Sequence, residues 1–442
     1  MPEPLRGYFP GSFETTSARL IFLALAASVA ASLLSIAASQ IMLAVASFGA
    51  VAFLRPRPSR FSHLGQMLLV LALFLAWTIL AAVASSDVRL GLTITKKFFI
   101  LLILLLVPLA AEGAGRVTWI YRAVFAAAVV SSAVGLIQFI ANPERDLLHR
   151  ISGLMGQWMT FSGLLMLALV ALAAYCVCFD WRRQWWVIPA GTMIFAAIYL
   201  SQTRSAVLGV IAGILVVLLL RRPRAALLLL VLIPALYFLS PARIQQRFRA
   251  GWHAEDPNTR NRIELVETSL RLIRDNPWFG VGPKNVAREA PRYRGSGDYP
   301  DWMYQHMHNN LLQIAAERGI PGLLLWLWFM LGLAWDAWRL SVRSRRDPAS
   351  GEALMAATAA LGCWVALMVS GFFEYNFGDS EILALFLFVM AAPYAFRVRG
   401  IDRLQGGGEV AAGEPAKQRT SPGAPAIERV QAKPARGTAS QS

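Results

Sequence analysis

Charged side chains are scarce in this chain. They account for 15% of its 442 residues, whereas 56% are hydrophobic and the mean hydropathy is +0.50. This composition excludes an ordinary soluble globular domain and favours a protein embedded in a membrane. Acidic residues are the scarcer kind, 26 against 42 Lys and Arg, and the net charge of +16 is compatible with an anionic partner. Because most Arg residues form short clusters between apolar runs, we assign them to membrane topology rather than to nucleic-acid binding.

Cysteine is nearly absent, which limits redox and metal chemistry. Cys176, Cys178 and Cys363 each lie inside an apolar segment without candidate partner ligands, and we interpret them as packing thiols. A cleavable signal peptide is not expected either, because the first apolar run lacks a small-x-small cleavage site followed by a soluble domain. That run is interpreted as the first membrane span.

Long apolar runs fill most of the remaining sequence. A helix crosses the ~30 Å hydrocarbon core of a bilayer with about 20 apolar residues, and with fewer where flanking side chains reach the interface. The sequence therefore predicts an all-α polytopic membrane protein with about twelve transmembrane helices and a large, mostly helical outer loop between spans 9 and 10. The predicted spans are 19–36, 38–54, 63–84, 97–112, 117–140, 157–179, 185–200, 204–220, 225–240, 320–338, 353–372 and 380–396.

The Arg clusters between these runs predict the orientation of the chain. When the spans are numbered from a cytoplasmic N-terminus, every strong cluster falls on the cytoplasmic side, as the positive-inside rule requires. The clusters lie at 55–60, 116, 182–183, 221–224, 339–346 and 397–403. Both termini are therefore predicted to be cytoplasmic.

The predicted organisation has five parts. They are a cytoplasmic N-terminus (1–18), spans 1–9 (19–240), an outer loop that carries a polar motif (241–319), spans 10–12 (320–397) and a cytoplasmic tail (398–442). The tail is rich in Gly, Ala, Pro, Ser and Arg without apolar periodicity, which predicts disorder. No internal repeat is visible, which disfavours a transporter built from inverted halves.

A short polar-faced helix is predicted at 308–318, directly before the tenth span. Asn309 and Glu317 then lie on the same face of this helix. Gly319 suits a helix end, and Pro321 suits the first turn of the next helix. The sequence therefore predicts two consecutive helices with a break between them.

His308 is the residue of this segment that can carry chemistry. At the amino-terminal end of a helix the dipole disfavours the imidazolium, and a neutral imidazole is a competent general base at physiological pH. The alternative is that His306 and His308 merely cap an interfacial helix.

Several Arg residues on the outer side form a candidate anion site. Arg204 opens the eighth span, where a cation is costly to keep, and its guanidinium can bind an anionic oxygen pair in a bidentate manner. Arg262 belongs to a predicted amphipathic helix at 258–274, Arg288 follows it, and Arg150 lies in an earlier outer loop. The alternatives are an Arg that snorkels to the interface and solvated charges paired with the interleaved acids.

The last outer loop contains a further polar group that precedes the final span. Its members are Glu374, Asn376, Asp379 and Glu381. A helix N-cap is the simpler interpretation. A metal site is poorly supported, because no partnered carboxylate spacing recurs elsewhere on the outer side, and no metal ligand is assigned.

Taken in series, these segments resemble the bacterial O-antigen ligase and O-antigen polymerase superfamily, over roughly residues 145–395. The matching elements are His308-Asn309 followed after nine residues by Gly319-x-x-Gly322, Arg204-x-x-x-Leu208, Arg262 in the helix before the turn Asn276–Gly282, and the stretch Arg150–Gly156. The His motif is fairly specific, whereas the others are weak singly.

The resemblance implies an enzyme of the bacterial inner membrane with its active site in the periplasm. Similar proteins move a glycan from an undecaprenyl diphosphate carrier on the periplasmic leaflet. Ligases transfer it to a sugar hydroxyl of lipid A-core, polymerases to the growing repeat chain, and a related branch to protein Ser or Thr. The nine-residue gap with both glycines resembles ligases more than polymerases.

The resemblance also implies roles for individual residues. The expected reaction is inverting and independent of metal or other cofactors, with His308 as general base and with Arg204 and Arg288 on the diphosphate. Substrate-binding or orienting roles are expected for Arg262, Arg150, His306, Asn309 and Glu317. The expected partners are the lipid-linked donor, the lipid A-core acceptor and membrane lipid, with no nucleic acid.

The alternatives are an O-antigen polymerase, a protein O-oligosaccharyltransferase and, as a non-enzyme, a lipid or glycan transporter. A transporter is disfavoured because the ionisable groups gather at the outer ends of the spans rather than at their centres. The central geometric expectation is that His308 and Arg204 share one chamber.

Overall fold

The computed structural model describes 13, 15–53, 64–112, 115–142, 150–179, 181–240, 242, 245–246, 257–297, 299–345 and 350–396. The chain divides into two units, Met1–Arg397 and Val398–Ser442, and all described residues belong to the first. The predicted tail 398–442, most of the predicted N-terminus 1–18 and the Arg clusters at 55–60 and 397–403 lie outside the described residues.

Every regular element among the described residues is a helix, which confirms the all-α fold class. Eight helical segments are long and apolar enough to cross a membrane, and three shorter apolar helices accompany them. Each predicted span coincides with a helix, although the count of twelve crossings stays a prediction. The corresponding elements are α1 (Thr16–Ala31), α2 (Ile36–Phe53), α3 (Gly65–Val83), α4 (Val88–Leu92) with η3 (Thr93–Leu102) and α5 (Ile103–Ala110), α6 (Arg116–Ala141), α7 (Trp158–Cys178), α8 (Val187–Leu200), α9 (Arg204–Arg221), α10 (Pro223–Ala226) with α11 (Leu228–Leu239), α15 (Asn310–Ser344), α16 (Gly351–Ser370) and α17 (Ser380–Ala391) with η9 (Ala392–Ala395).

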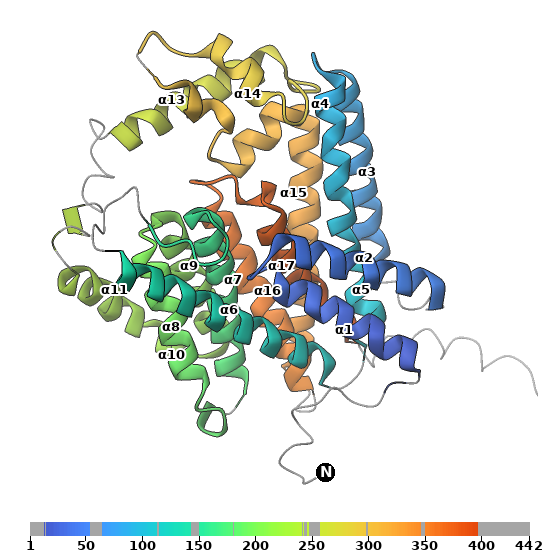
Figure 1. The fold of residues 1–442 in the computed structure, drawn as a ribbon, viewed down its shortest axis with the longest axis vertical. Coiled ribbons are helices and arrows are strands. Elements are labelled where there is room, and N and C mark those ends of the chain that lie inside the picture. The colour runs from blue at the N-terminus through green and yellow to red at the C-terminus, as the bar shows by residue number, and fades with distance from the viewer. Residues whose placement is uncertain are drawn as a thin grey trace, which may run out of the picture. The chain divides into compact units, whose positions relative to one another are not determined.

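The helices are apolar around most of their circumference, and burial separates central helices from peripheral ones. In α7 and α16, 78% and 72% of the spanning window is buried, against 22% in α2. A helix that stays apolar on its exposed face is suited to lipid contact. Figure 1 shows α1, α2 and α6 running obliquely to the upright α3 and α15.

Small residues allow the central helices to approach closely. A Cβ added at Gly213 of α9 would lie 2.9 Å from the carbonyl oxygen of Gly362 in α16. Such contacts between glycines are a common packing device between membrane helices. They fix α9 against α16, and both helices contribute to the site described below.

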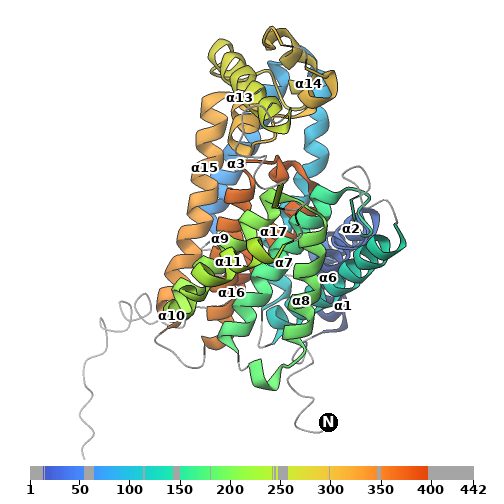
Figure 2. The same ribbon diagram turned by 90° about the vertical axis from the view of Figure 1, so that its left-hand side faces the viewer.

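A second group of helices covers one end of the bundle. We call α13 (Pro257–Asp275), α14 (Val286–Glu289), η5 (Ala290–Tyr293) and η6 (Asp301–Gln305) the α13–α14 layer (Figures 1 and 2). It has a small hydrophobic core that includes Leu265, Leu272 and Tyr304. The helix predicted at 258–274 is therefore confirmed, but Leu265 and Leu272 form its buried face, whereas the apolar side chains of Ile263, Val266 and Leu270 are exposed.

Arg clusters gather at the opposite end of the bundle. The Arg345 guanidinium donates a hydrogen bond of 2.8 Å to the Leu220 carbonyl, which joins the ends of α15 and α9 there. The residues of α10 and of η4 (Trp181–Arg183) lie at the same end in Figure 2. This is the arrangement that the predicted topology requires, and the assignment of that end to the cytoplasm stays a prediction.

Candidate active site

The start of α15 differs from the sequence-based prediction. The helix begins at Asn310, and Asn309 is its N-cap, because the Asn309 side chain accepts hydrogen bonds from the backbone N–H groups of Leu311 (2.9 Å) and Leu312 (3.1 Å). His308 therefore precedes the helix instead of opening it, so the predicted boundary was wrong by two residues. Its φ of 46° is a left-handed value that a non-glycine residue rarely adopts and that costs of order 1–3 kcal/mol.

The predicted break between two helices is confirmed. Gly319 interrupts the helical backbone inside α15 with φ 69° and ψ −178°. A Cβ at this position would lie 2.0 Å from the Trp278 carbonyl oxygen. The N–H of Ile320 donates to the Pro277 carbonyl at 2.8 Å, so the turn after α13 lies directly along the break.

Both described histidines contact one carboxylate. His306 Nε2 lies 3.1 Å from Glu374 Oε1, and His308 Nδ1 lies 3.2 Å from each Glu374 oxygen. The two imidazole centroids are 4.1 Å apart. Because an ionised carboxylate can only accept, these nitrogens carry the protons, and Nε2 of His308 is left as the basic nitrogen.

The carboxylate of Glu374 is buried, with 8% of the residue exposed. Burial by itself raises its pKa, but the hydrogen bonds and charges of His306 and His308 lower the pKa from 4.5 to about 2. Glu374 is thus ionised throughout the physiological pH range. Its position in the sequence predicts only a polar loop and does not indicate contact with the histidines.

The first turn of α15 holds the loop that carries Glu374. The backbone N–H of Asn310 donates to the Gly371 carbonyl at 2.7 Å, and its side chain donates to Asn376 Oδ1 at 2.7 Å. The Asn310 side-chain oxygen accepts from the N–H of Phe377 at 3.1 Å. Buried side chains with satisfied hydrogen bonds of this kind fix a single geometry. The histidines and their carboxylate partner are therefore positioned by the packing of α15 against the α16–α17 connection.

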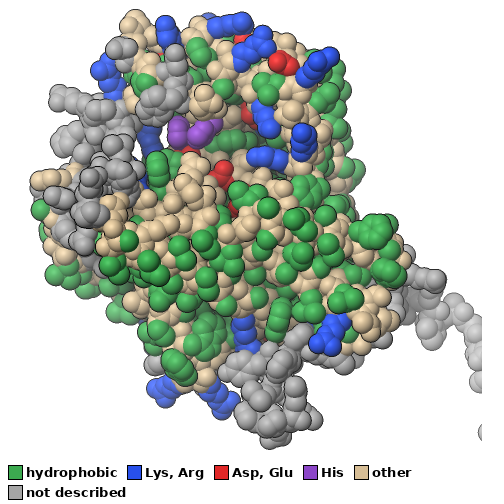
Figure 3. Space-filling view, in the orientation of Figure 1, with side chains coloured by type: hydrophobic (Ala, Val, Ile, Leu, Met, Phe, Trp, Pro, Cys, Tyr) green, Lys and Arg blue, Asp and Glu red, His purple; other side chains and the backbone are tan. Residues whose placement is uncertain are grey.

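His308 also lines a cavity of about 500 Å³ between α9, α13 and the start of α15. Arg204, Arg262 and Asn309 line the same cavity, together with the apolar side chains of Leu208, Ile263, Val266, Phe372 and Phe373. Figure 3 shows the histidine side chains at the surface beneath the α13–α14 layer. The expectation that His308 and Arg204 share one chamber agrees with this geometry.

The cations around this cavity act on one another. Burial lowers the pKa of Arg262; the charge of Arg204 lowers it further, and Glu374 opposes the shift. Burial and the charge of Arg204 likewise lower the pKa of Arg150, which lies 5.0 Å over the Trp158 ring. Mutually repelling guanidiniums beside a largely apolar cavity favour an anionic ligand with an apolar body.

Two other predicted site residues lie elsewhere. Arg288 of α14 pairs with Asp87 before α4 at 3.3 Å and does not line the cavity. Glu317 is buried, with 3% of the residue exposed, and forms an ion pair with Arg318. Their predicted roles in diphosphate binding and orientation stay predictions.

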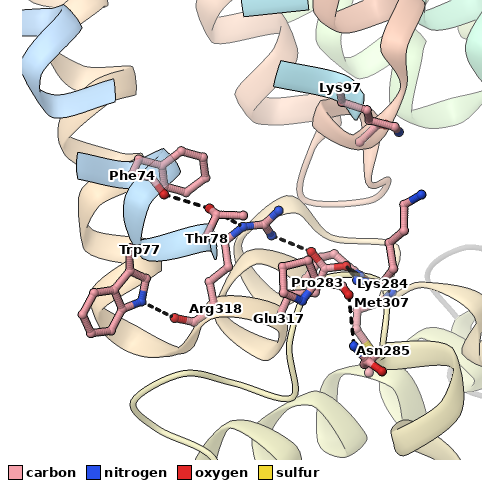
Figure 4. Close-up of polar contacts among 12 residues, drawn as sticks. Phe74, Trp77, Thr78, Lys97, Pro283, Lys284, Asn285, Met307, Glu317 and Arg318 are labelled. Atoms are coloured by element: carbon pink, nitrogen blue, oxygen red, sulfur yellow. Dashed lines mark hydrogen bonds and ion pairs between the residues drawn. The ribbon is translucent and has the colours of Figure 1, made fainter. Parts of the chain in front are cut away.

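Figure 4 shows what Glu317 contacts. One carboxylate oxygen accepts from the backbone N–H of Lys284 at 2.9 Å and from the side-chain amide of Gln313 at 2.9 Å. Its partner Arg318 donates to Thr78 Oγ1 at 3.1 Å, and the indole N–H of Trp77 donates to the Arg318 carbonyl at 2.9 Å. This network joins the turn after α13 to α3 and supports the helix break from behind.

His306, His308 and Glu374 are also a candidate metal-binding group. Their donor atoms all lie within 4.8 Å of one another. The two histidines lie 66 and 68 positions before Glu374, so the spacing of carboxylates along the chain could not reveal this group.

Comparison with known proteins is consistent with this arrangement. No curated protein matches the chain. A family model described as O-antigen ligase matches residues 190–327, a range that includes Arg204, Arg262 and His308 but neither Arg150 nor Glu374. The match supports glycosyl transfer of the ligase or polymerase type on lipid-linked glycans. Together with the all-α, multi-pass architecture, the match supports membership of the chain in the O-antigen ligase/polymerase superfamily.

Proposed function

We propose that the chain is an O-antigen ligase of the bacterial inner membrane, with a periplasmic active site and cytoplasmic termini. It transfers a glycan from undecaprenyl diphosphate to a sugar hydroxyl of lipid A-core, with inversion and without a metal ion. The observation that carries the proposal is the shared cavity of His308, Arg204 and Arg262. It combines a candidate base with two candidate anion ligands in a mainly apolar surround, to which Glu267, Ser205 and Thr259 also belong.

The donor is proposed to occupy this cavity. Its diphosphate lies between Arg204 and Arg262, with Arg150 close behind, and its polyprenyl chain contacts the apolar lining. Guanidiniums fixed in advance stabilise the charge that develops on the leaving diphosphate. Arg288 does not line this cavity and would have to act from outside it. Its contribution is tested with Arg288→Ala in the ligation assay described below.

Acid–base chemistry is assigned to His308 and Glu374. The Nε2 atom of His308 takes the proton of the acceptor hydroxyl as its oxygen forms a bond to the anomeric carbon. The bond from that carbon to the diphosphate oxygen breaks, and its electron pair leaves with the diphosphate. Glu374 holds the other ring nitrogen of His308 and stabilises the imidazolium that forms, in the manner of the carboxylate in a catalytic triad.

Asn309 and His306 are proposed as positioning residues. Asn309 fixes the start of α15 directly after His308, and His306 shares the carboxylate with it. Glu317 acts at a greater distance, because it secures the turn that borders the helix break. None of these three is required to touch the reacting atoms.

The test is an in vitro ligation with purified protein, a defined undecaprenyl diphosphate-linked glycan and lipid A-core. Loss of a base costs roughly 10²–10⁴-fold and loss of one strong anion ligand roughly 10²–10³-fold. His308→Ala and Arg204→Ala are expected to fall by these factors. Arg292→Ala is the matched control, since Arg292 is exposed in η5, pairs with Glu289 and does not line the cavity.

Near-normal ligation by His308→Ala would remove the base assignment. A requirement for added metal after chelation would remove the metal-free mechanism. The acceptor separates the alternatives. A polymerase extends a second lipid-linked repeat, a protein O-oligosaccharyltransferase modifies Ser or Thr, and a transporter forms no glycosidic bond.

A further inference from the structure

We infer that His306, His308 and Glu374 form a binding site for one divalent transition-metal ion of the Zn²⁺ type, and that the occupied site is inactive. The binding part depends only on the three side chains. The inhibitory part rests on the proposed function, because it requires His308 to act as the base.

The spacing of the donor atoms suits tetrahedral coordination. Bonds of about 2.0–2.1 Å to Zn²⁺ place neighbouring ligand atoms roughly 3.3 Å apart. The observed separations from Glu374 Oε1 are 3.1 Å to His306 Nε2 and 3.2 Å to His308 Nδ1. Because all three donor atoms lie within 4.8 Å of one another, small side-chain movements can bring them around one ion.

The ligand types select the class of ion. Two imidazoles and one carboxylate, with the fourth position open to water, are a set that zinc sites use. Mg²⁺ and Ca²⁺ require six or more oxygen ligands, which these residues do not supply. Late first-row divalent ions bind such nitrogen-containing sets most strongly, so Zn²⁺ and Co²⁺ are suitable probes.

The site is held in place by its surroundings. Glu374 is buried, and its loop is tied to α15 through Asn310, so the carboxylate needs no reorganisation. The left-handed backbone of His308 brings its ring onto the same carboxylate as that of His306. The His306 side chain is about one-third exposed, so water can reach the remaining coordination position.

The neighbouring charge limits the affinity. Arg262 interacts with Glu374, and a cation close to the site opposes a second one. We therefore expect reversible binding, weaker than that of structural zinc sites with four protein ligands. Such an ion can be removed by a chelator without unfolding the protein.

Coordination would remove the base by moving a proton. An ion on Nδ1 of His308 takes the nitrogen that now donates to Glu374, so the proton of the neutral ring must stand on Nε2. Nε2 is then a donor and cannot accept the proton of the acceptor hydroxyl. The ion also occupies the carboxylate that stabilises the imidazolium.

The test uses the full chain in detergent after chelator treatment. Titration with Zn²⁺ against a chromophoric chelator, and with Co²⁺ followed by its visible absorption, is expected to show one ion per chain. His306→Ala and Glu374→Gln should weaken binding by more than about 100-fold, since loss of a supporting outer group alone costs 10–100-fold. Glu289→Gln is the control, because Glu289 is a buried carboxylate bonded to Ser86 and Arg292 instead.

Activity is measured on the same samples. Zn²⁺ is expected to suppress ligation by the unaltered protein to background, and chelation to restore it. Absent stoichiometric binding, or binding that survives in both ligand variants, would overturn the site. Full binding without loss of ligation would overturn the inhibition. Activity of metal-free His308→Ala would instead refute the proposed base, and it would leave the binding result untouched.

Discussion

Replacing Glu374 by Gln isolates the charge that faces the two histidines. The fall of its pKa from 4.5 to about 2 corresponds to about 3 kcal/mol in favour of the carboxylate over the acid at this site. The amide keeps the size of the side chain but carries no charge, and its NH₂ group opposes one imidazole N–H. We therefore expect both the orientation of His308 and the stabilisation of its imidazolium to be lost.

The expected loss is bounded by the base itself. General-base catalysis is worth roughly 10²–10⁴-fold, and removal of the carboxylate in a catalytic triad reaches the upper end of that range. Glu374→Gln should thus lower kcat by roughly 10²–10⁴-fold while the KM for the donor changes little, because Arg204 and Arg262 are untouched. Glu374→Asp keeps the negative charge on a shorter side chain, farther from the imidazoles, and should recover part of the rate.

Initial rates at varied donor concentration, with the acceptor saturating, measure both constants. Thermal unfolding in detergent shows whether the variant is folded, and Glu289→Gln controls for the loss of a buried carboxylate elsewhere in the protein. A folded Glu374→Gln protein with kcat within a few-fold of the unaltered chain would refute the reasoning. An increase in the donor KM alone would assign Glu374 to binding instead.

Three further predictions concern stability, each followed by thermal unfolding in detergent. Gly319→Ala should destabilise the protein by more than about 3 kcal/mol, because the new Cβ meets the Trp278 carbonyl at a positive φ; Gly351→Ala, which has open space, should be neutral, and equal effects would contradict the argument. Glu317→Ala should cost about 3–5 kcal/mol by leaving Arg318 buried and unpaired, so an unchanged unfolding temperature would count against it. Burial raises the pKa of Asp379 from 3.8 to about 6, so the folded chain holds that proton more tightly and stability falls as the pH rises between these values. At pH 7.5, Asp379→Asn should therefore be more stable than the unaltered chain by about 1–3 kcal/mol and should unfold at a higher temperature. At pH 4 the substitution should give no such gain.

The helices could be predicted because their signals are local. Apolar runs of span length, the extent of α13 and the Gly319 break each depend on residues within a single segment. The two-residue error at the start of α15 came from placing His308 inside the helix. Asn309 is a preferred N-cap residue, so the correct boundary was available from that signal.

The site could be predicted only in part, because its partners are distant in sequence. Glu374 follows His308 by 66 positions and reaches it only through the packing of α15 against the α16–α17 connection. Arg288 pairs with Asp87, 201 positions away. Because a prediction from charge alone cannot include this pair, it assigns Arg288 to the same anion site as the cavity cations. Pairing of this kind is a tertiary property, and no periodicity in one segment contains it.

The residues around the cavity are held in place by two different parts of the fold. Arg204 begins α9, which packs against α16 through Gly213 and Gly362, and the His308–Glu374 pair is tied to the end of the same α16. Arg262 comes from α13 instead. The same layer also adjoins the base, because η6 ends directly before His306 and the N–H of Val281, in the turn after α13, donates to the Ala316 carbonyl of α15 at 2.8 Å. The α13–α14 layer therefore fixes Arg262 and the histidine side of the cavity together, whereas Arg204 is fixed by the packing of α9 against α16.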